Sequence, residues 1–379
     1  MQVNPTVTLP DKEVILLNPE AEKVQSYPWF DWLRFVLASV VVLDHAGFKF
    51  APFLTGNLAV SVFFALSGWL IGGILLRTET QELPRFFFNR ATRIWIPYFL
   101  AIIFLYGAAA LREGVNFFWL KYLVMDVTFT HQLFAIFPIA QFEMPLQGSG
   151  NQFWSLSVEE QFYLLSPLVM LFIPKGKTLL LWLLIGMGTL LLSKHCGPIA
   201  LGVIASIMQR DFAIAQKPWV RLLALILIAG SALALSMPFG DKSRYFESFL
   251  SVAVVVLLAV PGERNKLGLF LGGLSFPLYL NHWLGLVLMH SLAKYAGLLE
   301  FPGLPFITYL TAVVFTIPIF WLVDRQVLKR RNDWFSEKIG QGLGLVAYVM
   351  VIIGLILGIL MHQYGPRGVV PPEFSERIN

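Results

Sequence analysis

The sequence predicts an all-α membrane protein, a polytopic bundle of transmembrane helices with about ten core spans and one extra C-terminal span. Of its 379 residues, 57% are hydrophobic and only 13% are charged, whereas roughly a quarter of the residues in a soluble domain are charged. The mean hydropathy is +0.69. Apolar stretches near the ~20 residues that cross a bilayer recur along the whole chain, and no alternation typical of strands competes with them.

Eleven apolar segments are candidate spans. Residues 117–140 are also apolar, but Lys121, Asp126, His131 and Pro138 interrupt them, and we interpret them as a re-entrant or surface segment outside the membrane. A full crossing there would reverse the orientation of everything downstream. The candidate spans are residues 32–50, 58–76, 94–111, 152–173, 178–194, 197–209, 219–237, 246–260, 269–293, 304–324 and 342–362.

The distribution of basic residues predicts that the N-terminus is cytoplasmic. With that orientation, 18 of the 28 Lys and Arg fall on the cytoplasmic side, as expected from their accumulation in cytoplasmic loops. Residues 1–28 are polar and form a cytoplasmic tail, residues 29–340 form the membrane domain, and residues 341–379 add one transmembrane helix and a short external tail. The net charge of +5 suits basic loops facing anionic lipid headgroups and requires no nucleic-acid partner.

Metal and redox chemistry lack sequence signals in this chain. The single Cys196 excludes an intramolecular disulfide framework and a multi-cysteine metal site. We find neither zinc-ligand spacing nor a phosphate-binding glycine loop, and we therefore predict no metal site.

The first candidate span carries two ionisable residues on one face. Arg34 and His45 are separated by roughly 20° beyond three full helical turns and by about 16 Å along the axis. Because an arginine near the centre of a bilayer costs at least ~2.5–3.5 kcal/mol, this face is predicted to line a protein-enclosed polar cavity. The alternative is that Arg34 reaches the headgroups and His45 belongs to a buried hydrogen-bond network.

Two further stretches place charge at or inside the membrane. Glu159 and Glu160 begin a span and precede a long uncharged run, so at least one enters the protein interior. We expect Glu160 to lie at the membrane interface near the start of its helix, where a carboxylate is favoured. Arg90 and Arg93 are neighbours on a helical face, with Arg85 nearby, and could form a cytosolic clamp for phosphates. Anchoring at the cytoplasmic surface explains the same three arginines.

Five stretches combine these residues into a recognisable order: Asp31 to Arg34 followed by His45, Phe63 to Ile71, Arg90 to Pro97, Trp154 to Tyr163, and Leu274 to His282. Together they resemble the acyltransferase-3 family of membrane acyltransferases, and the fourth is similar to its WSLxxEEQFY signature almost letter for letter. The resemblance extends from about residue 29 to about residue 325. The chain departs from the family pattern at Trp32, Trp69 and Asp324, and the two tryptophans could reshape the cavity that receives the acceptor.

The resemblance implies transfer of an acyl group, commonly acetyl, from cytosolic acetyl-CoA to a hydroxyl of a carbohydrate or lipid-linked acceptor at a bacterial inner membrane. No cofactor is bound permanently, because the acyl-CoA is a substrate. His45 would be the general base or, alternatively, a covalent acyl carrier. The resemblance also gives catalytic roles to Glu159, which would stabilise charge or orient His45, and to Arg34, which would bind the polar arm of the donor or balance charge in the cavity. Arg85, Arg90 and Arg93 would bind the donor, and Trp154, Tyr279 and His282 would bind the substrate.

Other functions fit part of the pattern. A transporter or flippase also buries Arg, His and Glu along a substrate or proton pathway, but the second half does not repeat the patterns of the first. A silent membrane scaffold would not need this set of ionisable residues. Ser67 could be a nucleophile, although Ser67, Gly68 and Gly72 favour close helix packing. Gly354 and Gly358 indicate helix packing or a homodimer contact.

Overall fold

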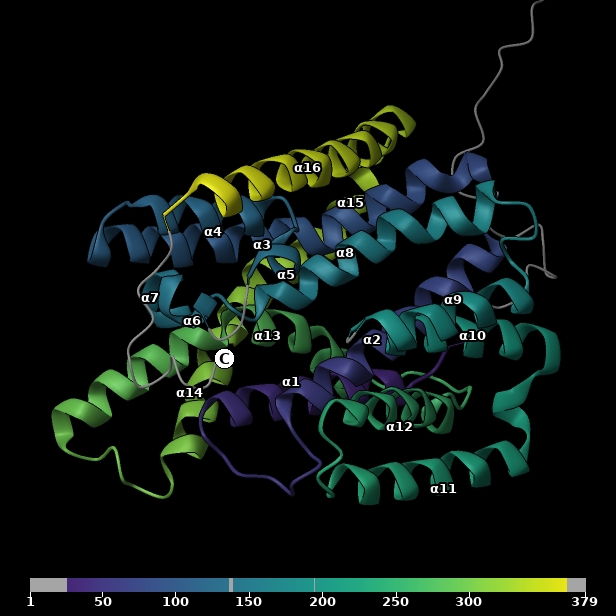
Figure 1. Ribbon diagram of the computed structural model, residues 1–379, viewed down its shortest axis with the longest axis horizontal. Helices are drawn as coiled ribbons and strands as arrows, with labels where there is room; N and C mark the ends of the chain where they lie inside the picture. The colour runs from purple at the N-terminus through teal and green to yellow at the C-terminus, as the bar shows by residue number, and fades with distance from the viewer. Residues whose placement is uncertain (1–25, 136–138, 194, 367–379) are drawn as a thin grey trace, which may run out of the picture.

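The computed structural model describes residues 26–135, 139–193 and 195–366, and within these ranges it contains helices and no strand. Most long helices run along the long axis of the molecule (Figure 1). Each predicted span coincides with a helix, which confirms the all-α class. These helices are α1 (Trp29–His45), α2 (Gly56–Arg77), α3 (Leu83–Glu113), α8 (Phe153–Pro167), α9 (Leu179–Leu192), α10 (Cys196–Phe212), α11 (Pro218–Leu235), α12 (Ser243–Leu258), α13 (Lys266–Ala296), α14 (Leu304–Ile319) and α16 (Glu337–Tyr364).

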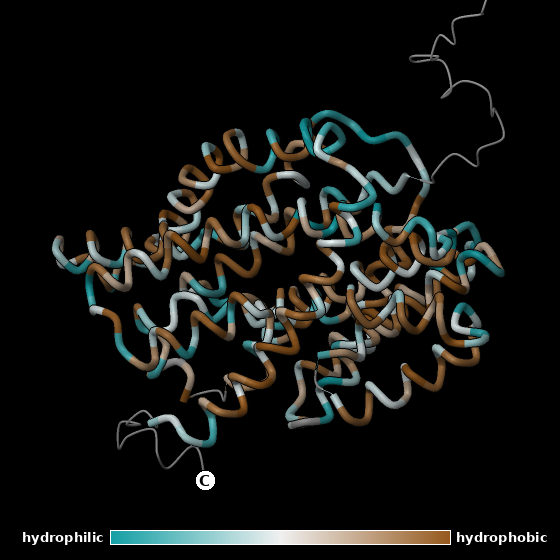
Figure 2. Tube along the Cα trace, turned by 90° about the horizontal axis from the view of Figure 1, so that it is seen from above, coloured by the Kyte–Doolittle hydropathy of each residue, from teal (hydrophilic) through white to brown (hydrophobic). Residues whose placement is uncertain are grey.

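The surface of the bundle is that of a helical membrane protein. Hydrophobic residues dominate along the helices, and hydrophilic residues gather in the loops at their ends (Figure 2). Within the described ranges, five helical segments are long and apolar enough to cross a membrane by length and composition. They are Gly56–Arg77, Thr80–Glu113, Pro218–Leu235, Leu304–Trp334 and Glu337–Tyr364.

Small residues bring α2 and α10 into close contact. A Cβ atom built on Gly68 would overlap the carbonyl oxygen of Ile199, and one built on Gly202 would overlap the carbonyl oxygen of Ala65. At Gly72 the added atom would lie 2.5 Å from the hydroxyl of Ser206. The small-residue face predicted around Gly68 and Gly72 therefore packs one helix backbone against another.

The last helix, α16, packs against α3 and α4 at one side of the bundle (Figure 1). Gly340 and Gly344 face Pro84 and Phe87 of α3. Further along, Gly354 faces Thr128, and Gly358 faces Phe134. Of the two roles predicted for Gly354 and Gly358, packing within the chain is the one present here. The hydroxyl of Tyr348 also donates to the carbonyl of Leu164 at 2.8 Å, which joins α16 to α8.

The structure contradicts one of the two interpretations of residues 117–140, the surface location, because the polar side chains of the segment are buried, while the re-entrant alternative stays a prediction. The segment forms α4 (Phe117–Val127) and α5 (His131–Phe134), and Lys121, Asp126 and His131 are all buried. Asp126 accepts hydrogen bonds from His131 and Tyr106, both at 2.6 Å, and Lys121 pairs with Glu143 at 2.5 Å. An 11-residue helix is too short to cross a bilayer. Pro138 lies outside the described residues.

The packing of α2 predicts opposite effects for two glycine-to-alanine substitutions. Gly68→Ala should lower the free energy of unfolding by about 1–3 kcal/mol, because the new methyl overlaps the backbone of Ile199. Gly73→Ala is the matched control, since nothing lies within 4 Å of a Cβ there. It should be neutral or stabilise the helix by up to about 1 kcal/mol. Thermal unfolding in detergent measures both variants, and equal effects would contradict the packing.

Candidate active site

A cavity of about 120 Å³ lies between α1, α2, α3, α8 and α13. Three guanidinium groups line it, those of Arg34, Arg90 and Arg93, together with a single carboxylate from Glu159. Arg93 is exposed, whereas Arg34 and Arg90 lie deeper. The site therefore has an excess of positive charge and suits an anionic ligand. These four residues belong to three of the five stretches singled out in the sequence, and the fold brings the three stretches together.

Two hydroxyl groups hold the carboxylate of Glu159. Ser67 donates a hydrogen bond to Oε1 at 2.6 Å, and Tyr163 donates to Oε2 at 3.1 Å. Ser67 thus combines a packing position on α2 with a polar contact in the cavity. Glu160, expected at the membrane interface, is instead buried in the middle of α8, where the indole nitrogen of Trp95 donates to it at 2.8 Å. That expectation was wrong because the indole gives the carboxylate a hydrogen-bond donor inside the protein.

The arginines predicted to bind the donor differ in their surroundings. Nε of Arg90 is buried and has no hydrogen-bond partner within the described residues. A buried, unsatisfied donor is costly, so a ligand that accepts from it would be bound favourably. Arg85 does not line the cavity. It donates to Asn332 at 2.6 Å and lies 4.4 Å from the ring centre of Phe335.

His45 forms a pair with His282 at the end of α1. Nδ1 of His45 lies 2.9 Å from Nε2 of His282, and the two rings are nearly parallel. Nδ1 of His282 lies 2.7 Å from the carbonyl oxygen of Tyr279. A carbonyl only accepts, so Nδ1 of His282 must carry a hydrogen. In the neutral, buried His282 the other nitrogen then accepts, and His45 donates to it through Nδ1.

This hydrogen-bond order leaves Nε2 of His45 with a lone pair. His45 is the last residue of α1 and its side chain is exposed, so the lone pair is accessible. The lining of the cavity includes Arg34 but not His45. The expectation that one cavity would hold both residues is therefore not met. The partner of His45 is His282, and Glu159 is bonded to Ser67 and Tyr163 instead.

Tyr279 connects the histidine pair to the cavity. Its carbonyl accepts from His282, while its side chain lines the cavity. Its hydroxyl donates to the carbonyl of Gln152 at 2.9 Å and lies 2.6 Å from the hydroxyl of Ser155. Trp154, the third residue predicted to bind substrate, lies outside this cavity and lines a separate pocket beside it. Tyr279, held by Ser155, thus joins the histidine pair to the arginine cavity.

The sequence did not reveal the partner of Asp31. Arg264 precedes α13 and makes two hydrogen bonds to the buried carboxylate of Asp31, at 2.6 and 2.5 Å. Arg34 lies 3.6 Å from the same carboxylate. This ion pair fixes the start of α1 against α13 and thereby positions Arg34. The two residues are 233 positions apart in the chain, and no local pattern links them.

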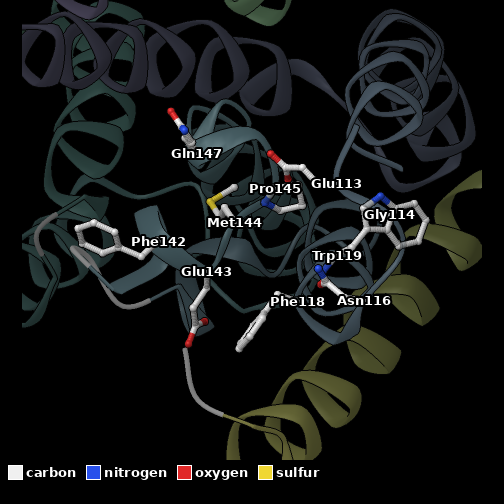
Figure 3. Close-up of a pocket in the computed structure, with 10 residues that line it drawn as sticks. All are labelled: Glu113, Gly114, Asn116, Phe118, Trp119, Phe142, Glu143, Met144, Pro145 and Gln147. Atoms are coloured by element: carbon white, nitrogen blue, oxygen red, sulfur yellow. The ribbon is translucent and has the colours of Figure 1, made fainter. Parts of the chain in front are cut away.

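Another hollow, of about 710 Å³, lies elsewhere, between α3, α4, α6 (Ile139–Glu143) and α7 (Pro145–Gly148) (Figure 3). None of the predicted site residues lines it. Its polar groups support the fold: Glu113 accepts from the backbone of Leu146, Asn116 caps α4, and Glu143 pairs with Lys121. Within the described ranges, no group of three or more His, Cys, Asp or Glu is arranged to hold a metal ion.

Comparison with known proteins agrees with the geometry. A family model described as an acyltransferase domain matches residues 27–325. The chain belongs to the acyltransferase-3 family. It is therefore an acyltransferase by family, and α16 lies beyond the matched region. No solved structure matches the chain.

Curated relatives of this family member carry out O-acetylation. O-acetyltransferase OatA of Staphylococcus aureus is 27% identical over 326 residues, covering 70% of this chain and 51% of that protein. Peptidoglycan O-acetyltransferase OatA of Listeria monocytogenes is 30% identical over 174 residues, covering 43% of this chain and 28% of that protein. The chain spans about half the length of the first relative and less of the second.

The ion pair at the start of α1 predicts an asymmetric response to substitution. Arg264→Leu should lower the free energy of unfolding by about 1–3 kcal/mol, because it removes two hydrogen bonds from a buried carboxylate. Asp31→Asn should cost less, since the amide keeps one acceptor oxygen for the half-exposed guanidinium of Arg264 and for Arg34, which lies 3.6 Å away. The exposed Lys266→Leu serves as the control. Thermal unfolding of the purified variants checks the order, and a larger loss for Asp31→Asn would contradict it.

Proposed function

We propose that this protein transfers an acyl group, most simply acetyl, from acyl-CoA to a hydroxyl of a carbohydrate acceptor, which is either free or lipid-linked. The observation that carries the proposal is the pairing of His45 with His282, which leaves an accessible lone pair on Nε2 of His45. The O-acetyltransferase relatives support acetyl as the group and a glycan as the acceptor. Acyl-CoA is the donor substrate, and no permanent cofactor is required.

His45 acts as the general base in this proposal. A hydroxyl is a poor nucleophile near neutral pH and needs a proton acceptor, for which an imidazole is well suited. The hydroxyl proton passes to Nε2 of His45 while the oxygen bonds to the thioester carbon. The C–S bond then breaks, and the proton returns from His45 to the departing thiolate. The products are an acetyl ester and free CoA. His282 orients His45 and does not itself touch the reacting atoms.

The arginine cavity binds the donor. Arg90 and Arg93 contribute positive charge, and the unsatisfied Nε of Arg90 offers a buried donor for a phosphate or carbonyl oxygen. Arg34 is about three helical turns from His45. The pantetheine arm of CoA is an extended chain, so phosphates near Arg90 and Arg93 are compatible with a thioester placed toward His45. Glu159 limits the excess positive charge of the cavity and holds Ser67 and Tyr163 in place.

The same arrangement implies an orientation in the membrane. Acyl-CoA is cytosolic, so the end of the bundle where α3 begins faces the cytoplasm, and the end where α1 terminates at His45 faces outward. This agrees with the basic residues near the start of α3 and with a cytoplasmic N-terminus. The proposed location is a bacterial inner membrane, with lipids around the bundle. Family membership favours this enzyme over the transporter alternative.

Substitution of the histidine pair tests the base. His45→Ala should fold and insert but lose acetyl transfer by about 100-fold or more, because it removes the proton acceptor. His282→Leu should lower kcat through loss of the acceptor for Nδ1 of His45. His282→Gln retains an acceptor oxygen and should recover part of the rate.

Release of CoA from acetyl-CoA in the presence of an acceptor glycan measures these rates, with the exposed His290→Ala as control. Full turnover in His45→Ala would exclude the proposed base. Equal rates in His282→Leu and His282→Gln would show that His282 does not orient His45 through this hydrogen bond.

Substitution of the arginines tests donor binding. Arg90→Ala and Arg93→Ala should each raise the KM for acetyl-CoA by about tenfold, because each removes a charge-assisted contact with the donor. Arg77→Ala removes an exposed cation at the end of α2 and should leave the KM unchanged. Initial rates at varied acetyl-CoA concentration give these values. If the KM for acetyl-CoA is unchanged in both cavity variants, Arg90 and Arg93 do not bind the donor and serve as anchors at the membrane surface.

A further inference from the structure

A second, strongly polar pocket of about 190 Å³ lies beside the arginine cavity. Asn57 and Ser61 occupy neighbouring turns of one face of α2, next to the face that carries Ser67. The pocket is lined mainly by Asn57 and Ser61 of α2, Trp154 of α8, Arg244 and Glu247 of α12, and His195 beside the start of α10. A polar lining of this kind in a largely apolar bundle requires an explanation.

The two charged side chains of this pocket are close in sequence but not paired. Arg244 and Glu247 are three residues apart on α12, a spacing at which opposite charges usually meet. Arg244 instead donates to the carbonyl of Leu191 at 3.2 Å, and its Nε is buried with no hydrogen-bond partner within the described residues. Among the residues that the structure describes, the carboxylate of Glu247 makes neither a hydrogen bond nor an ion pair. One strong donor and one strong acceptor are therefore available to a ligand.

An aromatic surface completes the pocket. Trp154 is partly exposed, and its ring centre lies 4.5 Å from that of His195. On another side, Trp154 meets Phe64 edge to face at 5.8 Å. A ligand suited to this pocket has an apolar face for the indole and hydroxyl groups that both donate and accept at its edge. A sugar ring has this combination, because its C–H groups and hydroxyls point in different directions.

We propose that this pocket is a sugar subsite that binds a pyranose ring of the acceptor glycan next to the ring that is acetylated. The apolar face of the ring packs on Trp154, while its hydroxyls accept from Arg244 and donate to Glu247. Asn57 and Ser61 supply neutral contacts. This assignment rests on the proposed transfer to a glycan and adds the site that recognises the polymer.

The subsite is connected to the proposed reaction centre through direct contacts. Trp154 precedes Ser155, whose hydroxyl lies 2.6 Å from the hydroxyl of Tyr279. The backbone of Tyr279 in turn accepts from His282, the partner of His45. Phe64, which touches Trp154, also lines the arginine cavity. Asn57 of the pocket also follows Gly56 at the start of α2. Gly56 packs against Asp44, the residue before His45, so the pocket and His45 lie at the same end of the bundle.

Binding of a defined glycan tests the subsite. The probes are the β-1,4-linked tetramer of N-acetylglucosamine, a sugar of peptidoglycan strands, and the β-1,4-linked tetramer of glucose. Full-length protein in lipid nanodiscs is titrated with each probe and, separately, with acetyl-CoA. For the probe that the wild type binds, Glu247→Gln and Trp154→Leu should raise the Kd by about tenfold or more, because they remove a charged hydrogen bond and a packing surface. Their Kd for acetyl-CoA should stay at the wild-type value.

Matched substitutions in the larger hollow provide the control. Glu113→Gln and Trp119→Leu alter the same residue types around the groove of Figure 3 and should leave the Kd for the glycan unchanged. Loss of glycan binding only in Glu113→Gln and Trp119→Leu would show that the sugar binds in the hollow of Figure 3 and would overturn the proposal. Saturable binding of neither tetramer to the wild type, or unchanged binding in Glu247→Gln and Trp154→Leu, would also overturn it. Unfolding temperatures identify any variant that fails to fold, and Glu247→Gln changes little volume.

An acetyl-transfer assay separates this inference from the proposed function. Glycan binding that depends on Glu247, without acetyl transfer to any glycan, would support the subsite and contradict the proposed reaction. Acetyl transfer with a KM for the glycan that neither Glu247→Gln nor Trp154→Leu changes would support the proposed reaction and contradict the subsite.

Discussion

The site depends on one local hydrogen bond, in which the carbonyl oxygen of Tyr279 accepts from Nδ1 of His282. The oxygen cannot donate, so it fixes the tautomer of a buried imidazole and, through it, the direction of the bond from His45. Tyr279 and His282 are three residues apart on α13, and a side chain at this spacing can reach back to the preceding turn. The orientation of an exposed imidazole on α1 is thus set by the backbone of a helix more than 200 positions later in the chain.

Burial of charge in this bundle requires partners supplied from several helices. Asp31 has Arg264 and Arg34, Glu159 has Ser67 and Tyr163, and Glu160 has Trp95. Each carboxylate is thereby offered hydrogen-bond donors, which lowers the cost of removing it from water. Arg90 is different because its Nε is left without a partner in the described chain. A ligand that accepts a hydrogen bond from this Nε would satisfy it, which is consistent with a role of Arg90 in binding and not only in folding.

The sequence predicted helices, motifs and their order better than it predicted side-chain partners. Each of the eleven apolar stretches predicted from hydropathy coincides with a helix, and small residues at Gly68 and Gly72 predicted close packing, because both signals depend on local composition. Hydropathy also misled, since Lys121 and Asp126 looked like interruptions that belong at a surface. In the fold they are buried with Glu143, Tyr106 and His131 as partners. Pairing between distant residues leaves no periodic trace in a single sequence.

The arginine cavity and the polar pocket are both lined by α2, which packs closely against α10. Glycines at Gly68 and Gly202 let the two backbones touch, which leaves little room for solvent between these helices. Phe64 and Trp154 meet edge to face where the two spaces approach each other. In the proposed reaction, these two rings lie between the acyl-CoA donor and the glycan acceptor, so that donor and acceptor meet only at the end that carries His45. An oriented sugar hydroxyl would then reach the base more often than a water molecule does, which favours transfer over hydrolysis.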